Sequence, residues 1–92
     1  MELLPKELED TLPKLYDTED ILTDKKILHI RFIAIFSNWE WYLCEYDNNT
    51  KRAFGYVKGH EAEWGYFSLT EFQEINDENL KIIRDENFKP GA

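Results

Sequence analysis

The residues best suited to chemistry in this sequence are a histidine and the carboxylates that follow it. His60 precedes Glu61 and Glu63, so an imidazole and two acids lie close together in the chain. They supply part of a divalent-metal site, but a zincin needs two histidines spaced i, i+4 on a helix, and the other histidine, His29, falls on a predicted strand. We therefore interpret residues 60–63 as a polar loop and assign no metal ligand and no cofactor.

Nucleophilic catalysis has no recognisable signature in the chain. Cys44 is the single cysteine, which excludes an internal disulfide and fits a reducing compartment. No motif places a base beside it, no serine stands in a nucleophile-elbow pattern, and no glycine-rich loop is suited to phosphate. We expect Cys44 to be a buried structural residue, and we expect a non-enzymatic protein with no catalytic residue.

The aromatic run around residues 36–42 is the densest candidate binding surface. Strand alternation puts Trp39 and Trp41 on one sheet face and Glu40 and Tyr42 on the other. Two interpretations stay open: an exposed platform for a protein partner or a base, or a sheet covered by helices on one face and by side-chain stacking on the other. The candidate binding residues are Asn38, Trp39, Glu40, Trp41, Tyr42, His60, Glu61, Glu63 and Trp64.

The net charge of −8 argues against direct binding to nucleic acid or to an anionic membrane. The charge is uneven along the chain: residues 1–24 carry 2 basic and 8 acidic side chains (−6), residues 25–60 carry 6 and 3 (+3), and residues 61–92 carry 3 and 8 (−5). The two acidic segments either form a negative surface that occupies the nucleic-acid channel of a partner or serve only solubility. We expect the first to place the carboxylates on one face.

Helical signals occur near both ends of the chain. Pro5 and the acids after it, with leucines spaced i, i+4, predict a short N-terminal helix over residues 5–12 that packs on a sheet and ends at Pro13. Ser68 and Glu71 have the spacing of a capping box and predict a second, short amphipathic helix. Residues 17–26 read as a loop.

Strand signals fill the middle. Residues 27–36, 39–46, 52–57 and 64–67 are rich in β-branched and aromatic residues and are separated by turn residues, and residues 80–84 predict a last edge strand. Gly55 indicates a bulge or a close backbone contact. Short connections favour antiparallel neighbours. The expected fold is α+β: one domain over residues 1–92, an antiparallel β-meander of four or five strands with an N-terminal helix and a short C-terminal helix packed on it.

Several segments, taken in order, resemble the bacterial family called domain of unknown function 2958. They are Leu12-Pro13-Lys14-Leu15-Tyr16 with Thr18-Glu19, Phe36-Ser37-Asn38-Trp39 with Trp41-Tyr42, Glu45-Tyr46-Asp47, Phe54-Gly55-Tyr56-Val57, Gly65-Tyr66-Phe67-Ser68-Leu69 and Phe88-Lys89-Pro90. The resemblance implies a shared fold and a setting on mobile genetic elements, but no activity. The chain departs from the pattern at Trp64, where a smaller aliphatic residue is expected, and in its short tail.

These observations favour a small acidic protein-binding module that works in the cytoplasm as a monomer or small homo-oligomer. The mobile-element setting suggests an inhibitor of a host defence nuclease, of the anti-CRISPR or anti-restriction type, whose partner is a nucleic-acid-binding host protein. The alternative is a small-molecule or nucleotide-binding protein with a pocket lined by His29, Arg31, Trp41, Tyr42 or His60.

Overall fold

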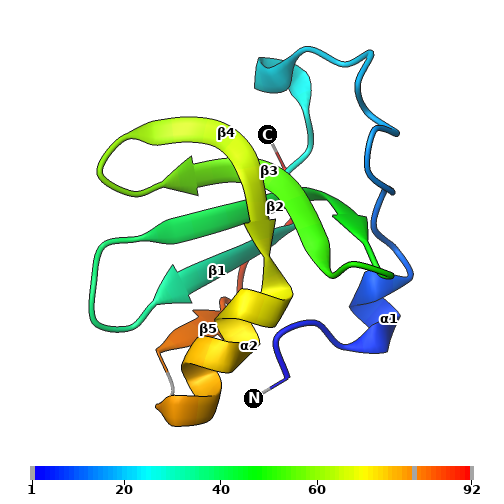
Figure 1. Ribbon diagram of the computed structural model, residues 1–92. Helices are drawn as coiled ribbons and strands as arrows, with labels where there is room; N and C mark the ends of the chain where they lie inside the picture. Colours follow the sequence, from blue (N-terminus) through cyan, green and yellow to red (C-terminus); the bar gives the residue numbers. More distant parts are fainter. Residues whose placement is uncertain (1, 80, 92) are drawn as a thin grey trace.

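The middle of the chain folds into the predicted β-meander (Figure 1). Four strands pair antiparallel in chain order: β1 (Ile30–Ala34), β2 (Glu40–Asp47), β3 (Arg52–Lys58) and β4 (Ala62–Ser68). β5 (Ile82–Arg84) adds to the far side of β1, so the sheet order is β4-β3-β2-β1-β5. The computed structural model describes residues 2–79 and 81–91, and Leu80, the first residue of the predicted last strand, lies outside them.

The second helix, α2 (Leu69–Glu78), crosses one face of this sheet and connects its two edges. The predicted cap is confirmed, because the Ser68 side chain accepts a hydrogen bond of 3.3 Å from the Glu71 N–H. Phe72 packs from the helix against Phe32 and Trp41, with ring centroids 5.7 and 4.7 Å away. Burying Phe72 in this way stabilises the fold by about 1.5–3 kcal/mol.

The hydrophobic core lies between α2 and the sheet. Alternation along the strands supplies it, since Ile30 and Phe32 of β1 pair with Leu43 and Trp41 of β2 on the same face. The buried cluster consists of Leu3, Ile30, Phe32, Leu43, Tyr46, Ala53, Phe67, Leu69, Phe72 and Ile82. Within the described residues, no helix is long and apolar enough to cross a membrane.

The predicted N-terminal helix is wrong in extent. The structure has only α1 (Lys6–Glu9), four residues without a buried side chain, and Leu8 is 37% exposed. A single turn gains few internal hydrogen bonds against the cost of nucleation, and no side chain caps its start. Leu4 and Leu12, on either side of α1, contact the core instead, so α2 is the one helix that covers the sheet among the described residues.

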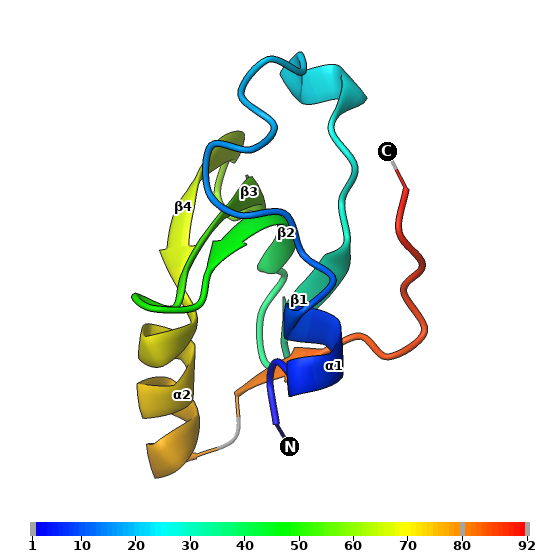
Figure 2. The same ribbon diagram turned by 90° about the vertical axis from the view of Figure 1, so that its right-hand side faces the viewer.

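The other face of the sheet carries irregular chain in place of a helix. Residues 13–27, here called the arm, contact β2 at Glu45 and β3 at Phe54, and residues 85–91 contact β1 at Arg31 and β2 at Tyr42. Figure 2 shows the C-terminal residues and α2 on opposite sides of the sheet. The first strand is accordingly shorter than predicted: Leu28 makes only an isolated bridge to Gly91, and Phe36 is 78% exposed in the turn before β2.

A β-bulge interrupts β2, as the glycine opposite it predicted. The β2–β3 register shifts between Leu43 and Glu45, which leaves Cys44 as the extra residue. Gly55 lies opposite this point, and a Cβ atom there would stand 1.8 Å from the Tyr42 carbonyl oxygen. Position 55 therefore requires glycine, because the backbone of β2 occupies the space that any side chain there would need.

The outer edge of β5 is closed by a side chain of α2. The Asn76 Nδ2 donates to the Ile82 carbonyl at 2.8 Å, and the Asn76 Oδ1 accepts the N–H groups of Ile82 and Lys81 at 2.9 and 3.0 Å. The amide of Asn76 thus does for β5 what a neighbouring strand does elsewhere in the sheet.

Asn76→Ala is expected to lower the free energy of unfolding by about 1–3 kcal/mol, because it leaves these backbone groups without partners. Chemical denaturation measures the change. The matched control is Gln73→Ala, since the exposed Gln73 amide donates to Asp77 on the same helix, and its effect should stay within about 0.5 kcal/mol. Equal effects of the two substitutions would contradict this role for Asn76.

Candidate functional site

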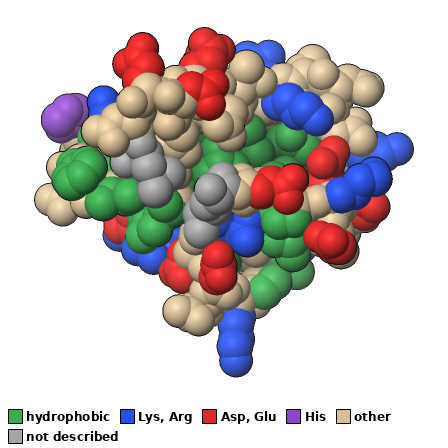
Figure 3. Space-filling model, turned by 90° about the horizontal axis from the view of Figure 1, so that it is seen from below, with side chains coloured by type: hydrophobic (Ala, Val, Ile, Leu, Met, Phe, Trp, Pro, Cys, Tyr) green, Lys and Arg blue, Asp and Glu red, His purple; other side chains and the backbone are tan. Residues whose placement is uncertain are grey.

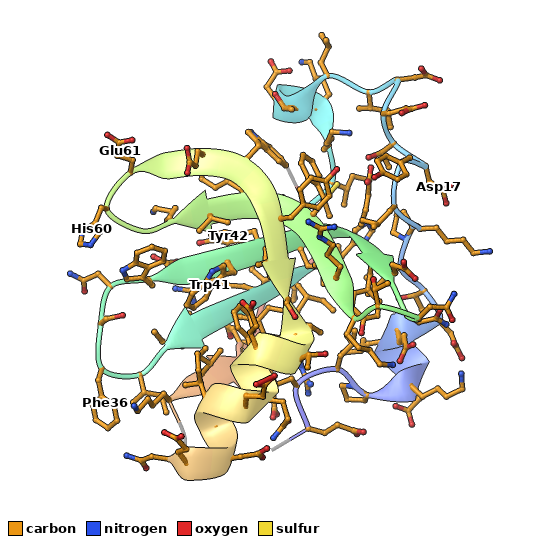
Figure 4. The ribbon with its side chains drawn as sticks, viewed as in Figure 1. Asp17, Phe36, Trp41, Tyr42, His60 and Glu61 are labelled. Carbon is orange, nitrogen blue, oxygen red and sulfur yellow. The ribbon has the colours of Figure 1, made fainter. Side chains whose placement is uncertain are left out.

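The candidate binding residues from the sequence are divided between the two sheet faces and a hairpin tip. Trp41 faces α2 and belongs to the core packing, whereas Glu40 and Tyr42 point to the opposite face. His60 and Glu61 project from the β3–β4 turn, away from Trp41 and Tyr42 in the middle of β2 (Figure 4). The pocket expected for a small molecule or nucleotide therefore does not form from Trp41, Tyr42 and His60.

Three of the predicted residues do share a hollow. Asn38, Trp39 and Glu40 line a shallow cavity of about 350 Å³ together with Arg31. Trp39 is held from its other side by the β3–β4 turn, where the His60 ring stacks edge-on at 5.6 Å and Gly59 lies directly against the indole. Trp39 thus joins two neighbouring turns and is half-buried in the free protein.

Arg31 organises the polar centre of the face opposite α2. Its guanidinium contacts the Glu40 carboxylate at 2.7 Å and the Asp85 carboxylate at 2.8 Å, and the Tyr42 hydroxyl donates to Glu40 at 2.6 Å. The Tyr42 hydrogen bond and then Arg31 lower the pKa of Glu40, and Arg31 lowers the pKa of Asp85. Each partner thus stabilises the charged form of the other. The Arg31–Asp85 ion pair also holds residues 85–91 against the sheet, which is a structural role.

Glu45 fastens the arm in the same way at the bulge. Its side chain is only 5% exposed, and its carboxylate accepts the backbone N–H groups of Tyr16 at 2.9 Å and Thr18 at 3.1 Å. The buried ammonium of Lys26 lies 3.7 Å from it and donates to the Thr18 hydroxyl at 2.7 Å. Tyr16 adopts a left-handed conformation (φ 73°), which costs about 1–2 kcal/mol and which these bonds hold in place.

Trp64, the last predicted residue, belongs to an aromatic layer on this same face. It stacks on Phe54 at 5.9 Å and meets Tyr56 edge-on at 5.5 Å. Tyr66 continues the layer, is 47% exposed, and has the Arg52 guanidinium 4.8 Å above its ring. Side-chain stacking on the face opposite α2, one of the two interpretations of the sequence, is therefore present, although it leaves Tyr66 open.

An apolar groove that the sequence did not predict lies between α1 and α2. It has a volume of about 420 Å³, and Leu3, Leu4, Tyr46 and Leu69 form its apolar lining. Figure 3 looks onto this end of the molecule, where hydrophobic side chains are visible between acidic and basic ones. We call this feature the α1–α2 groove.

Carboxylates from both acidic segments of the sequence line the α1–α2 groove. Glu2 and Glu9 come from the first segment and Glu74 and Asp77 from the second, with Lys51 as the basic residue among the lining side chains. An adjoining cavity of about 460 Å³ shares Glu9 and Tyr46 and adds Asp10 and Asp47. Burial, and then the nearby carboxylates of Glu9 and Asp47, raise the pKa of Tyr46 to about 12.

Some of the remaining carboxylates lie far from this end. Asp17 lies on the arm and Glu61 at the tip of the β3–β4 turn, on opposite sides of the molecule (Figure 4). The expectation of a single acidic face therefore holds only for the α1–α2 groove, where the two acidic segments meet.

One sequence signal for the α1–α2 groove was present. Thr70, Gln73, Glu74 and Asp77 recur at i, i+3, i+4 and i+7 on α2 and form a polar stripe beside its core-facing side. The sequence did not show that α1 would be too short to fill the space beside this stripe.

Two further candidates for chemistry are a metal site and the thiol of Cys44. The described residues contain no group of three or more His, Cys, Asp or Glu side chains placed to hold a metal ion. Cys44 is 1% exposed, as predicted, and burial raises the pKa of its thiol, which keeps it in the unreactive form.

Comparisons with protein-family models, with curated proteins and with solved structures find no match to this chain. The resemblance to the domain of unknown function 2958 family stays a prediction from the sequence segments. Two of those segments meet in the structure, because Tyr16 and Thr18 of the first donate to Glu45 of the third.

Proposed function

We propose that this protein is a small, non-enzymatic protein-binding module that receives a basic segment of its partner in the α1–α2 groove. One observation carries the proposal: acidic segments from the two ends of the chain, separated by a basic middle, come together around an apolar floor. Such a floor favours burial of one or two apolar side chains, and the carboxylates around it favour lysine or arginine beside them.

The partner class follows from this charge. Surfaces rich in lysine and arginine are typical of proteins that bind nucleic acid, because they neutralise phosphates. A module that occupies such a surface competes with the nucleic acid, so we propose that it inhibits a host defence nuclease in the cytoplasm, of the anti-CRISPR or anti-restriction type. The resemblance to a family found on mobile elements supports the same proposal.

The first test replaces two carboxylates of the groove. Glu74→Lys with Asp77→Lys is expected to weaken binding of a synthetic peptide, with leucines flanked by arginines, about tenfold or more, since two exposed attractions become repulsions of up to about 1 kcal/mol each. Fluorescence anisotropy measures the affinity, and raising the salt concentration should weaken binding of the unmodified protein because these charges are screened.

The matched control makes the same charge change elsewhere. Glu61→Lys with Glu63→Lys alters the β3–β4 turn and strand, outside the lining of the α1–α2 groove, and should reduce the affinity much less. Equal losses for the two double variants would show that net charge alone attracts the peptide, and the groove proposal would fail. Affinity capture from a host lysate with the unmodified protein and both variants then identifies the partner that depends on the groove.

A further inference from the structure

The two edge strands of the sheet, β5 and β4, differ in length and in how far their outward backbone groups are hydrogen-bonded. β5 is three residues long, and Asn76 bonds the outward N–H and C=O groups of Ile82. β4 is seven residues long, contains no proline or lysine, and has one charged residue, Glu63. Natural proteins usually block such an edge with charges, proline, bulges or a covering segment, because its open N–H and C=O groups pair with any suitable strand.

The hydrogen-bond alternation of the β3–β4 ladder shows which groups of β4 are open. At its two ends, Gly59 donates to the Glu61 carbonyl at 3.1 Å and Leu69 donates to the Lys51 carbonyl at 2.9 Å. In an antiparallel ladder, bonded pairs alternate with non-bonded pairs, so the odd-numbered residues of β4 bond to β3. The backbone groups of Ala62, Trp64 and Tyr66 therefore point outward, as does the Ser68 N–H, and no loop or side-chain hydrogen bond from the described residues reaches them. The Ser68 carbonyl is already used, because Ser68 is the N-cap of α2 and its C=O accepts the first hydrogen bond of the helix.

We propose that β4 pairs antiparallel with β4 of a second copy of the chain, with the twofold axis at Gly65. In this register Trp64 meets Tyr66 of the second copy and exchanges both backbone bonds with it, and the Ala62 carbonyl meets the Ser68 N–H of the second copy. The two sheets then join into one sheet of ten strands. Where a side chain at Gly65 would stand, nothing lies within 4 Å, so the axis position is open in the single chain.

The side chains on β4 are self-complementary in this register. Trp64 and the 47%-exposed Tyr66 form two symmetric aromatic cross-strand pairs, each contributing to the pairing. The acidic end of β4, with Glu61 and Glu63, comes to lie near the end of the second copy where β3 begins with Arg52, and all three are exposed. β4 of the second copy lies between these acids and Arg52, which stands over Tyr66, so the charges attract at a distance and form no direct ion pair.

Because the aromatic side chains of β4 complement themselves in this register, we infer that the strand that binds the β4 edge is β4 of a second copy. Shifting the register by two residues places Trp64 opposite Trp64 and leaves the backbone groups of one end unpaired. The dimer is independent of the α1–α2 groove, which is lined by residues outside β4. Either proposal can therefore fail without the other.

The experiment is disulfide cross-linking at the axis. In the proposed register, the two Gly65 residues form a non-bonded antiparallel pair with Cα atoms about 4.5 Å apart, within the range that a disulfide spans. Under mild oxidation, Gly65→Cys is expected to give a covalent dimer. The unmodified protein should sediment as a dimer whose fraction increases with concentration, and its buried Cys44 should not cross-link.

Glu63→Cys is the matched control, since it lies on the same strand and face but about 13 Å from its symmetry mate in this register. It should cross-link far less than Gly65→Cys. Equal or preferential cross-linking of Glu63→Cys would overturn the register. A monomer at every concentration, with no covalent Gly65→Cys dimer, would overturn the interface and leave the β4 edge to an extended segment of another protein.

Discussion

Replacing Glu45 with alanine is expected to lower the free energy of unfolding by about 3–5 kcal/mol, although most of its contacts are with an irregular segment. The substitution leaves the ammonium of Lys26 buried without a counter-charge, since both side chains are only 5% exposed. It also removes the acceptor of the Tyr16 and Thr18 N–H groups, which hold the arm against the sheet. Urea denaturation measures the loss, and limited proteolysis should show early cleavage within residues 13–27.

The controls separate the buried charge from the hydrogen bonds. Glu45→Ala combined with Lys26→Met should recover part of the lost stability, because the unpaired ammonium is gone, while the arm stays susceptible to protease. Glu63→Ala, which removes an exposed carboxylate from β4, should change stability by no more than about 0.5 kcal/mol. A Glu45→Ala protein within 1 kcal/mol of the unmodified one would contradict this role.

Local sequence patterns were sufficient for most of the sheet. Alternation identified β1, turn residues separated β2, β3 and β4, and the Ser68 cap located the start of α2. The prediction of a helix over residues 5–12 was wrong because the same leucine spacing also suits separate core contacts on either side of a single helical turn. Leu4 and Leu12 are used in that way, and no local signal distinguishes the two cases.

The α1–α2 groove and the two polar anchors depend on pairs far apart in the sequence. Glu45 appeared as an ordinary strand residue, and its partners Thr18 and Lys26 lie in a segment whose composition indicates a loop. A burial pattern cannot predict a buried carboxylate, because such a residue is stable there only if specific partners arrive from elsewhere. The partition of acidic charge was visible in the sequence, but the meeting of Glu9 with Glu74 required the tertiary structure.

Gly55→Ala should be the most damaging single-methyl change in the chain, with a loss of about 3 kcal/mol or more or a failure to fold. The added Cβ would lie 1.8 Å from the Tyr42 carbonyl oxygen, 2.9 Å from its carbonyl carbon and 3.2 Å from the Cys44 nitrogen. All three are backbone atoms of β2 at the bulge, so no side-chain rotation relieves the contact. β2 and β3 must separate, which disrupts one of the two longest strand pairings of the sheet.

Gly65→Ala is the matched control, because Gly65 pairs with Gly55 across the β3–β4 ladder and faces open space. Neither glycine has a positive φ, so backbone conformation does not distinguish them. Gly65→Ala should be neutral or stabilising by up to about 1 kcal/mol, since alanine restricts the unfolded chain. Thermal unfolding of the two variants side by side measures the difference. A similar loss at both positions would mean that any side chain in this glycine pair is harmful, whereas a loss confined to Gly55 identifies the close approach of β2 as the cause.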